Sequence, residues 1–186
     1  MSGSAARLEG DVAVDAARAG DGANDAARAL SAARKAGVRI AAAESLTGGL
    51  VSAALTEVPG ASDVFVGGIV SYDVGVKAGI LGVDDGLLSD KGPVSAAGAL
   101  AMAAGARTAL GGEVGVATTG VAGPDPHGGQ APGTVCVAAV APGRRLSRTL
   151  TIPGNRKDVR SGAAEAAIVV LVTILSPDAV GGTTEE

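Results

Sequence analysis

One stretch constrains the fold of this chain more than any other, residues 40–49, with the sequence IAAAESLTGG. A short apolar run stops there at a carboxylate and two hydroxyl groups, and two glycines precede an apolar pattern of helical period. Such a junction is typical of a strand that turns into a helix in an α/β protein. Because N–H groups at a helix start attract developing negative charge, Ser45 is the first candidate for chemistry.

Segments with the patterns of strands and helices alternate along the rest of the chain. Helices are predicted over residues 24–35, 47–57, 74–81, 93–110 and 155–175, and strands over 38–43, 64–72, 114–118, 134–141 and 146–152. Only a short Pro-Gly turn joins the last two strands, which predicts an antiparallel pair. The expected fold is a three-layer α/β/α domain with a mixed, mostly parallel sheet and one antiparallel hairpin.

The organisation expected for the chain is one domain over residues 23–176, between flexible tails at 1–22 and 177–186. Residues 84–92 are predicted to form a polar loop, and residues 119–133 a long loop with three prolines and five glycines. The β-branched segment 168–175 fits a strand as well as a helix, and the Ala-rich lead-in without a breaker favours a helix.

Composition excludes several classes of site and partner. A net charge of −4 and an aromatic content of 1% argue against a nucleic-acid binder. Cys136 is the only cysteine and His127 the only histidine, which excludes a disulfide within the chain, a cysteine-based metal site and a multi-histidine metal site. We therefore expect no metal and no cofactor.

Hydropathy argues against contact with a membrane. The N-terminal region lacks the apolar core of a signal peptide. The longest apolar stretch, residues 168–175, is far shorter than a membrane-spanning helix. These features predict a cytoplasmic protein.

Ser45 has two interpretations. As a helix N-cap it competes with Thr47, and position alone favours that role. As a nucleophile it needs a base, and the candidates are His127 and Lys77. His127 lies in a Gly/Pro-rich loop with no evident orienting carboxylate beyond Asp125, which is more typical of an exposed histidine.

Lys77 is the better candidate base, because serine–lysine pairs are a known form of nucleophilic catalysis. It lies among apolar residues, where burial would lower its pKa and leave the amine neutral. Tyr72, at the end of a predicted strand, can relay a proton or fix the serine–lysine geometry. The alternative is a surface lysine and a half-buried core tyrosine, and the sequence alone favours it.

Two further segments suit anionic groups. Thr119 and Gly120 follow a strand directly, and backbone N–H groups there can hold an oxyanion or a phosphate; a plain turn is the alternative. Arg156 and Arg160 are separated by one helical turn at a predicted helix start. That position repels the helix dipole unless an anion such as phosphate is bound, and two solvated arginines are the alternative.

Several motifs in a fixed order resemble the C-terminal domain of the CinA (competence/damage-inducible) proteins. They are AESLTGGLVSAALTEVPGAS, GGIVSYDVGVKAGILGV, MAAGAR, ATTGVAGP, PGTV and GNRKDVR. The resemblance covers residues 26–175. That family includes stand-alone nicotinamide-nucleotide amidohydrolases, which deamidate nicotinamide mononucleotide to nicotinate mononucleotide and ammonia without a metal. It is α/β and often homodimeric, so the resemblance implies a homodimer.

The resemblance also implies roles for individual residues. Ser45 of the ESxTGG motif matches the nucleophile, and Tyr72 and Lys77 match the residues assigned to proton transfer. The residues expected to bind the nucleotide substrate are Glu44, Thr47, Gly48, Gly49, Thr119, Gly120, Arg156 and Arg160. Phosphate contact is expected for at least one of the two arginines.

Residues 119–133 depart from the family pattern, because DPHGGQA stands where members usually have Gly-Gly and a lysine. Substrate identity is therefore less tightly implied than the catalytic set. Two other readings remain, a non-catalytic module that binds a nucleotide or a protein partner, and an amidase for another small amide.

Overall fold

The computed structural model describes residues 22–176, and the two predicted tails lie outside these residues apart from Gly22. In chain order the elements are α1 (Gly22–Ala36), β1 (Ile40–Glu44), α2 (Leu50–Thr56), a 3-10 turn (Ala61–Asp63), β2 (Phe65–Val70), α3 (Val74–Gly79), α4 (Asp85–Lys91), α5 (Ala96–Leu110), β3 (Val114–Gly120), β4 (Thr134–Ala141), β5 (Arg144–Thr151) and α6 (Arg156–Leu175).

The strands form a five-stranded sheet in the order β2-β1-β3-β4-β5. β1 pairs in parallel with both β2 and β3, whereas β4 is antiparallel to β3 and to β5. Four strands therefore run in one direction and β4 runs against them. The expected mixed, mostly parallel sheet with one antiparallel hairpin is confirmed.

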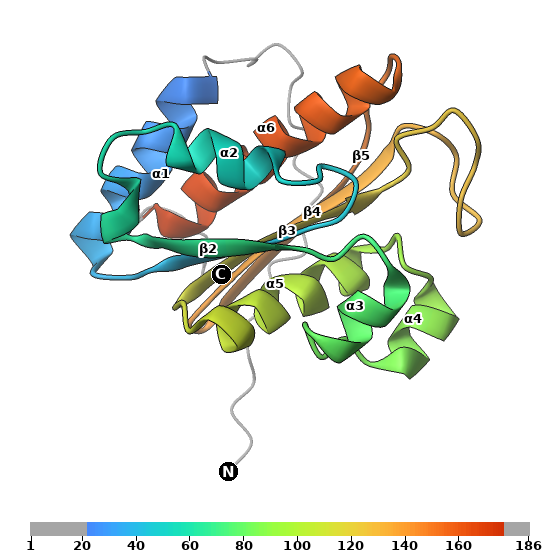
Figure 1. Ribbon diagram of the computed structural model, residues 1–186, viewed down its shortest axis with the longest axis horizontal. Helices are drawn as coiled ribbons and strands as arrows, with labels where there is room; N and C mark the ends of the chain where they lie inside the picture. Colours follow the sequence, from blue (N-terminus) through green and yellow to red (C-terminus); the bar gives the residue numbers. More distant parts are fainter. Residues whose placement is uncertain (1–21, 177–186) are drawn as a thin grey trace, which may run out of the picture.

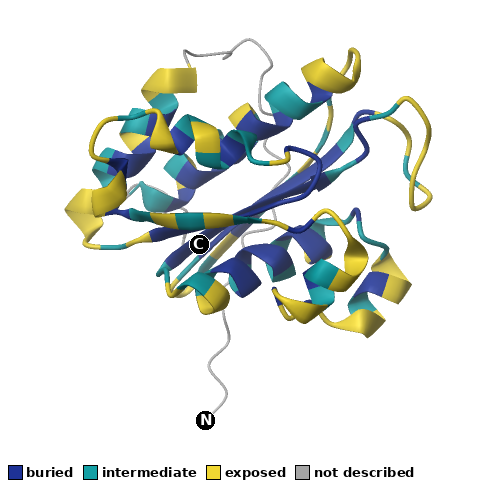
Figure 2. Ribbon diagram, in the orientation of Figure 1, coloured by how far each residue is buried: buried dark blue, intermediate teal, exposed yellow. Residues whose placement is uncertain are grey.

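Helices cover both faces of the sheet, as Figure 1 shows. α1, α2 and α6 pack on one face, and α3, α4 and α5 lie on the other. Along β1, Ile40 and Ala42 face the first layer while Ala41 and Ala43 face the second, because strand side chains alternate. Buried residues are concentrated between the layers (Figure 2), so the three-layer prediction is confirmed.

Small residues let the elements of this nearly aromatic-free core approach closely. A Cβ atom at Gly115 of β3 would overlap the backbone carbonyl of Ala103 on α5. One at Gly105 of α5 would overlap the Leu81 carbonyl in the same way. These glycines mark positions where a neighbouring backbone takes the space of a side chain.

One predicted loop is wrong, because Asp85–Lys91 is a helix, α4. The Asp84 carboxylate caps it by accepting a hydrogen bond from the Leu87 N–H at 2.9 Å. Leu88 is buried in the second layer, where α4 packs against α5. The polar composition of residues 84–92 suggested a loop, and the only local signal of this short helix is the capping residue Asp84.

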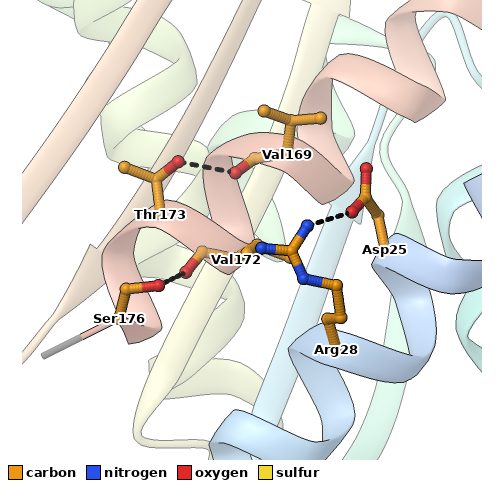
Figure 3. Close-up of polar contacts among 6 residues, drawn as sticks. All are labelled: Asp25, Arg28, Val169, Val172, Thr173 and Ser176. Atoms are coloured by element: carbon orange, nitrogen blue, oxygen red, sulfur yellow. Dashed lines mark hydrogen bonds and ion pairs between the residues drawn. The ribbon is translucent and has the colours of Figure 1, made fainter. Parts of the chain in front are cut away.

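The ambiguous segment 168–175 is helical, as predicted, and continues α6. Asn155 caps the start of α6, accepting from the Lys157 and Asp158 N–H groups at 2.8 and 3.3 Å. The opposite end lies close to α1, where Asp25 and Arg28 form an ion pair with an N–O distance of 2.7 Å (Figure 3). None of the described helices is long and apolar enough to cross a bilayer.

Candidate active site

The carboxyl ends of the parallel strands β2, β1 and β3 lie at one edge of the sheet, where α/β proteins commonly bind ligands. A pocket of about 500 Å³ opens there. It is lined by Ser45 after β1, by Tyr72 and Lys77 after β2, by residues 119–127 at the end of β3, and by Arg156 of α6. Four segments far apart in the sequence therefore supply these residues of one site.

The predicted site residues divide into two groups. Those that line the pocket are Ser45, Tyr72, Lys77, Thr119, Gly120 and Arg156. Those outside its lining are Glu44, Thr47, Gly48, Gly49 and Arg160.

Lys77 is buried, with 3% of its surface exposed, so the surface-lysine alternative is wrong. Burial lowers the pKa of its amine from 10.5, and the nearby Asp73 carboxylate opposes this by favouring the charged form. The Lys77 Nζ atom donates to Thr119 Oγ1 at 3.4 Å. A lysine in this setting can hold a neutral amine, which is the form that accepts a proton.

Thr119 orients the Lys77 amine. Its hydroxyl donates to the Pro93 carbonyl at 2.7 Å, so its oxygen is left to accept from Lys77. One N–H of the amine is thereby fixed, and Lys77 itself lines the pocket. The sequence around Thr119 could not predict this contact, because the Pro93 carbonyl comes from the loop before α5.

Ser45 is 7% exposed, and its backbone N–H donates to the Thr118 carbonyl at 3.0 Å. It does not cap the following helix, and neither does Thr47, because the N-cap residue of α2 is Gly49. The Ser45 hydroxyl forms no hydrogen bond with any of residues 22–176 and lies in the pocket lining. The N-cap interpretation of Ser45 is therefore wrong.

Glu44, the last residue of β1, takes the capping role that was expected of Ser45 or Thr47. Its carboxylate, 1% exposed, accepts from the Gly49, Val51 and Ser52 N–H groups at 2.9, 3.1 and 2.8 Å. The first N–H groups of α2 are thus already occupied by a protein carboxylate. The anion-attracting helix start expected after residue 45 is not free for a ligand.

Arg160 is also used within the protein. Its Nε and Nη2 atoms donate to the carbonyls of Leu46 and Thr47 at 2.9 and 2.8 Å. A Cβ at Gly48 would lie 3.2 Å from the same guanidinium, so a glycine with its φ of 59° suits this position. Arg160 therefore fixes the turn after Ser45, and the predicted phosphate role remains for Arg156.

Tyr72 and Arg156 form a pair at the exposed side of the pocket. Arg156 Nη2 donates to the Tyr72 phenol oxygen at 3.0 Å, and Nη1 donates to the Gly123 carbonyl at 3.0 Å. Tyr72 is 63% exposed, which contradicts the half-buried core alternative. Since its oxygen accepts from Arg156, the phenol hydrogen is available to a ligand.

His127 lies in the exposed loop between β3 and β4 and lines the same pocket. Its backbone pairs with that of Gln130 in an isolated β-bridge. Within the described residues, no cluster of three or more His, Cys, Asp or Glu side chains is arranged to hold a metal ion.

Fold and pocket together define an α/β protein with a serine and a buried lysine at the carboxyl edge of its sheet. The chain belongs to the CinA C-terminal domain family, whose model matches residues 23–175. This confirms the resemblance found in the sequence.

Relatives and solved structures agree with that assignment. The chain is 47% identical over 137 residues to a CinA-like protein from Frankia casuarinae, covering 74% of this chain and 32% of that protein. It is 48% identical over 140 residues to a CinA-like protein from Mycobacterium marinum, covering 74% and 33%. It spans about a third of the length of these curated relatives.

A competence or damage-inducible protein from Enterobacter asburiae superposes with a TM-score of 0.81 at 30% identity, covering 84% of this chain and 99% of that chain. The CihA protein from Agrobacterium tumefaciens gives 0.80 at 33%, covering 84% and 97%. These names give no substrate, so nicotinamide-nucleotide specificity stays a prediction, as do the homodimer and the cytoplasmic location.

Proposed function

We propose that this chain is an amidohydrolase that converts nicotinamide mononucleotide and water to nicotinate mononucleotide and ammonia. The observation that carries the proposal is that Ser45 and Lys77 line the same pocket, with Lys77 buried and its pKa lowered. A hydroxyl and a neutral amine are the two groups that a serine–lysine hydrolase needs. The substrate is the one that the family resemblance implies.

In the proposed reaction, neutral Lys77 takes the Ser45 hydroxyl proton while Ser45 Oγ bonds to the carboxamide carbon. The carbon–nitrogen bond then breaks, and the departing nitrogen takes that proton from Lys77 to leave as ammonia. Water attacks the acyl-enzyme with Lys77 again as base, and the proton returns to Ser45 Oγ. The product carboxylate carries the oxygen of that water.

The developing oxyanion needs donors beside Ser45. The Leu46 N–H is the nearest in the chain, and it has no acceptor within residues 22–176. Leu46 lines the pocket, as does Gly120 at the carboxyl end of the neighbouring strand β3. We assign the oxyanion contact to the Leu46 N–H in preference to Gly120.

Arg156 is the basic side chain of the exposed part of the pocket and is the candidate phosphate contact. Tyr72 beside it can donate its free phenol hydrogen to the substrate or relay a proton. Binding energy from the phosphate would then hold the amide near Ser45.

An ammonia-release assay with the purified chain and nicotinamide mononucleotide tests the proposal. Ammonia and nicotinate mononucleotide in equal amounts are the expected result. Binding without turnover would instead favour a non-catalytic module. Turnover of amides that lack a 5′-phosphate, in preference to the nucleotide, would favour an amidase for another small amide.

A further inference from the structure

Glu44, the residue immediately before the proposed nucleophile Ser45, is a buried carboxylate. Glu44 accepts five hydrogen bonds, all from residues 47–52 of the turn and helix that follow Ser45. Besides the three N–H groups, the donors are the hydroxyls of Thr47 and Ser52, each at 2.7 Å. No basic side chain within residues 22–176 pairs with it. Its partners are all neutral donors that the turn itself presents.

These bonds leave one backbone donor free at the pocket. The Ser45 carbonyl accepts from the Gly48 N–H at 3.1 Å, which directs that carbonyl into the turn. In a trans peptide the N–H of the next residue points the opposite way, so the Leu46 N–H faces out of the turn. Arg160 holds the Leu46 carbonyl from the α6 side and fixes the following peptide as well.

We propose that Glu44 is a positioning residue for catalysis, which fixes the 45–49 turn so that the Leu46 N–H and the Ser45 hydroxyl face the same reacting carbonyl. The inference deepens the proposed function and rests on it. Glu44 acts through the turn, because it lies outside the pocket lining. It replaces the substrate-binding role expected for this residue.

The chemistry of the site explains why a carboxylate is needed. Glu44 Oε2 accepts from the Gly49 and Val51 N–H groups, and Oε1 accepts from the Ser52 N–H. A glutamine has the same shape but carries two hydrogens on one of its terminal atoms. In either orientation its NH₂ group would face a backbone N–H, so the turn must shift.

The first test compares Glu44→Gln with Thr118→Val. The Thr118 hydroxyl donates to Thr47 Oγ1 at 2.7 Å in the same buried layer, and its loss leaves all five contacts of Glu44 in place. Glu44→Gln should lower kcat for nicotinamide mononucleotide on the order of 10²-fold, as for a lost oxyanion donor, with KM within about threefold. Thr118→Val should stay within about threefold in both constants.

Three results would overturn the proposal: an unchanged kcat for Glu44→Gln, a loss confined to KM, or an equal loss in Thr118→Val. Ser52→Ala removes one of the five bonds and keeps the carboxylate, so it serves if the glutamine variant does not fold. It should lower kcat by a few-fold, roughly what one neutral hydrogen bond contributes, and by more than Thr118→Val does; a loss no larger than that of Thr118→Val would contradict the proposal.

Amide hydrogen exchange gives a readout that does not need activity. Glu44→Gln should speed exchange in residues 49–52 by roughly tenfold or more, with β3 and α6 unchanged, because the Glu44 carboxylate accepts backbone N–H groups only from that segment. If the wild type releases no ammonia but exchange rises selectively in Glu44→Gln, the proposed function is wrong, whereas the inference that Glu44 fixes the turn is supported. Uniform loosening, or no change in the turn, would overturn the positioning role itself.

Discussion

The pocket has a buried wall, formed by Ser45, Lys77 and Thr119, and an exposed rim, formed by Tyr72, Arg156 and His127. The wall residues are 7%, 3% and 0% exposed, whereas Tyr72 on the rim is 63% exposed. Burial removes water, so it lowers the pKa of an amine and strengthens each polar contact. Groups on the rim are screened by solvent, so they can recognise a ligand but do not gain the stronger polar contacts of the buried wall. The wall is therefore suited to bond breaking and the rim to recognition.

The largest expected effect is at the wall, from Ser45→Ala. Loss of the nucleophile should lower the rate of ammonia release by a factor on the order of 10³ or more. Ser89→Ala is the matched control, because that exposed serine bonds only to the Asp85 carbonyl of its own helix. Near-normal turnover by Ser45→Ala would reject the wall as the catalytic part of the pocket.

Lys77→Arg should also be inactive, by roughly 10²-fold to 10⁴-fold, because a guanidinium cannot act as a neutral base. In the wild type, only the deprotonated amine accepts the Ser45 proton. kcat/KM should therefore rise with pH through the pKa of Lys77, which burial places below 10.5. An active arginine variant, or a rate that falls over this limb, would point to another base.

On the rim, Arg156→Ala should raise KM for the nucleotide by about tenfold to a hundredfold, as for a lost charge-assisted hydrogen bond, with a smaller change in kcat. Nicotinamide riboside, which lacks the phosphate, is the matched substrate and should show little difference between wild type and variant. An equal effect on both substrates would mean that Arg156 acts through Tyr72 or Gly123 instead.

Stability offers a separate test of the wall through Lys77→Met. Between the lowered pKa of Lys77 and its ordinary value of 10.5, the unfolded chain binds a proton that the folded protein does not, so stability rises with pH. The methionine variant lacks this penalty and should unfold at a higher temperature at neutral pH. Its advantage should shrink as the pH approaches 10.5. Thermal unfolding at several pH values would detect the trend, and a less stable variant at neutral pH would contradict it.

The smallest effect is expected from His127→Ala on the rim. The contacts that hold this residue are backbone bonds to Gln130, so kcat/KM should change by less than about threefold. A loss comparable to that of Lys77→Arg would assign the base to the rim and remove the distinction between the two parts of the pocket.

Much of this molecule could be predicted from its sequence, because strands, most helices and the Ser45 turn are encoded by local apolar patterns. α4 is the exception among the helices, since its polar composition resembled a loop. The position of Thr119 and Gly120 at the end of a predicted strand pointed to a site. The low exposure of Lys77 was not encoded in the same way, because its apolar neighbours Val74 and Ile80 are themselves exposed.

Which charged side chain faces the pocket was decided only by the tertiary structure. Arg156 and Arg160 are equivalent in sequence, yet one lines the pocket and the other bonds to carbonyls more than a hundred residues earlier in the chain. Glu44 likewise turns away from the ligand side toward the start of α2. Local patterns determine the elements, whereas the direction and partners of a polar side chain depend on the backbone groups that packing brings within hydrogen-bonding distance.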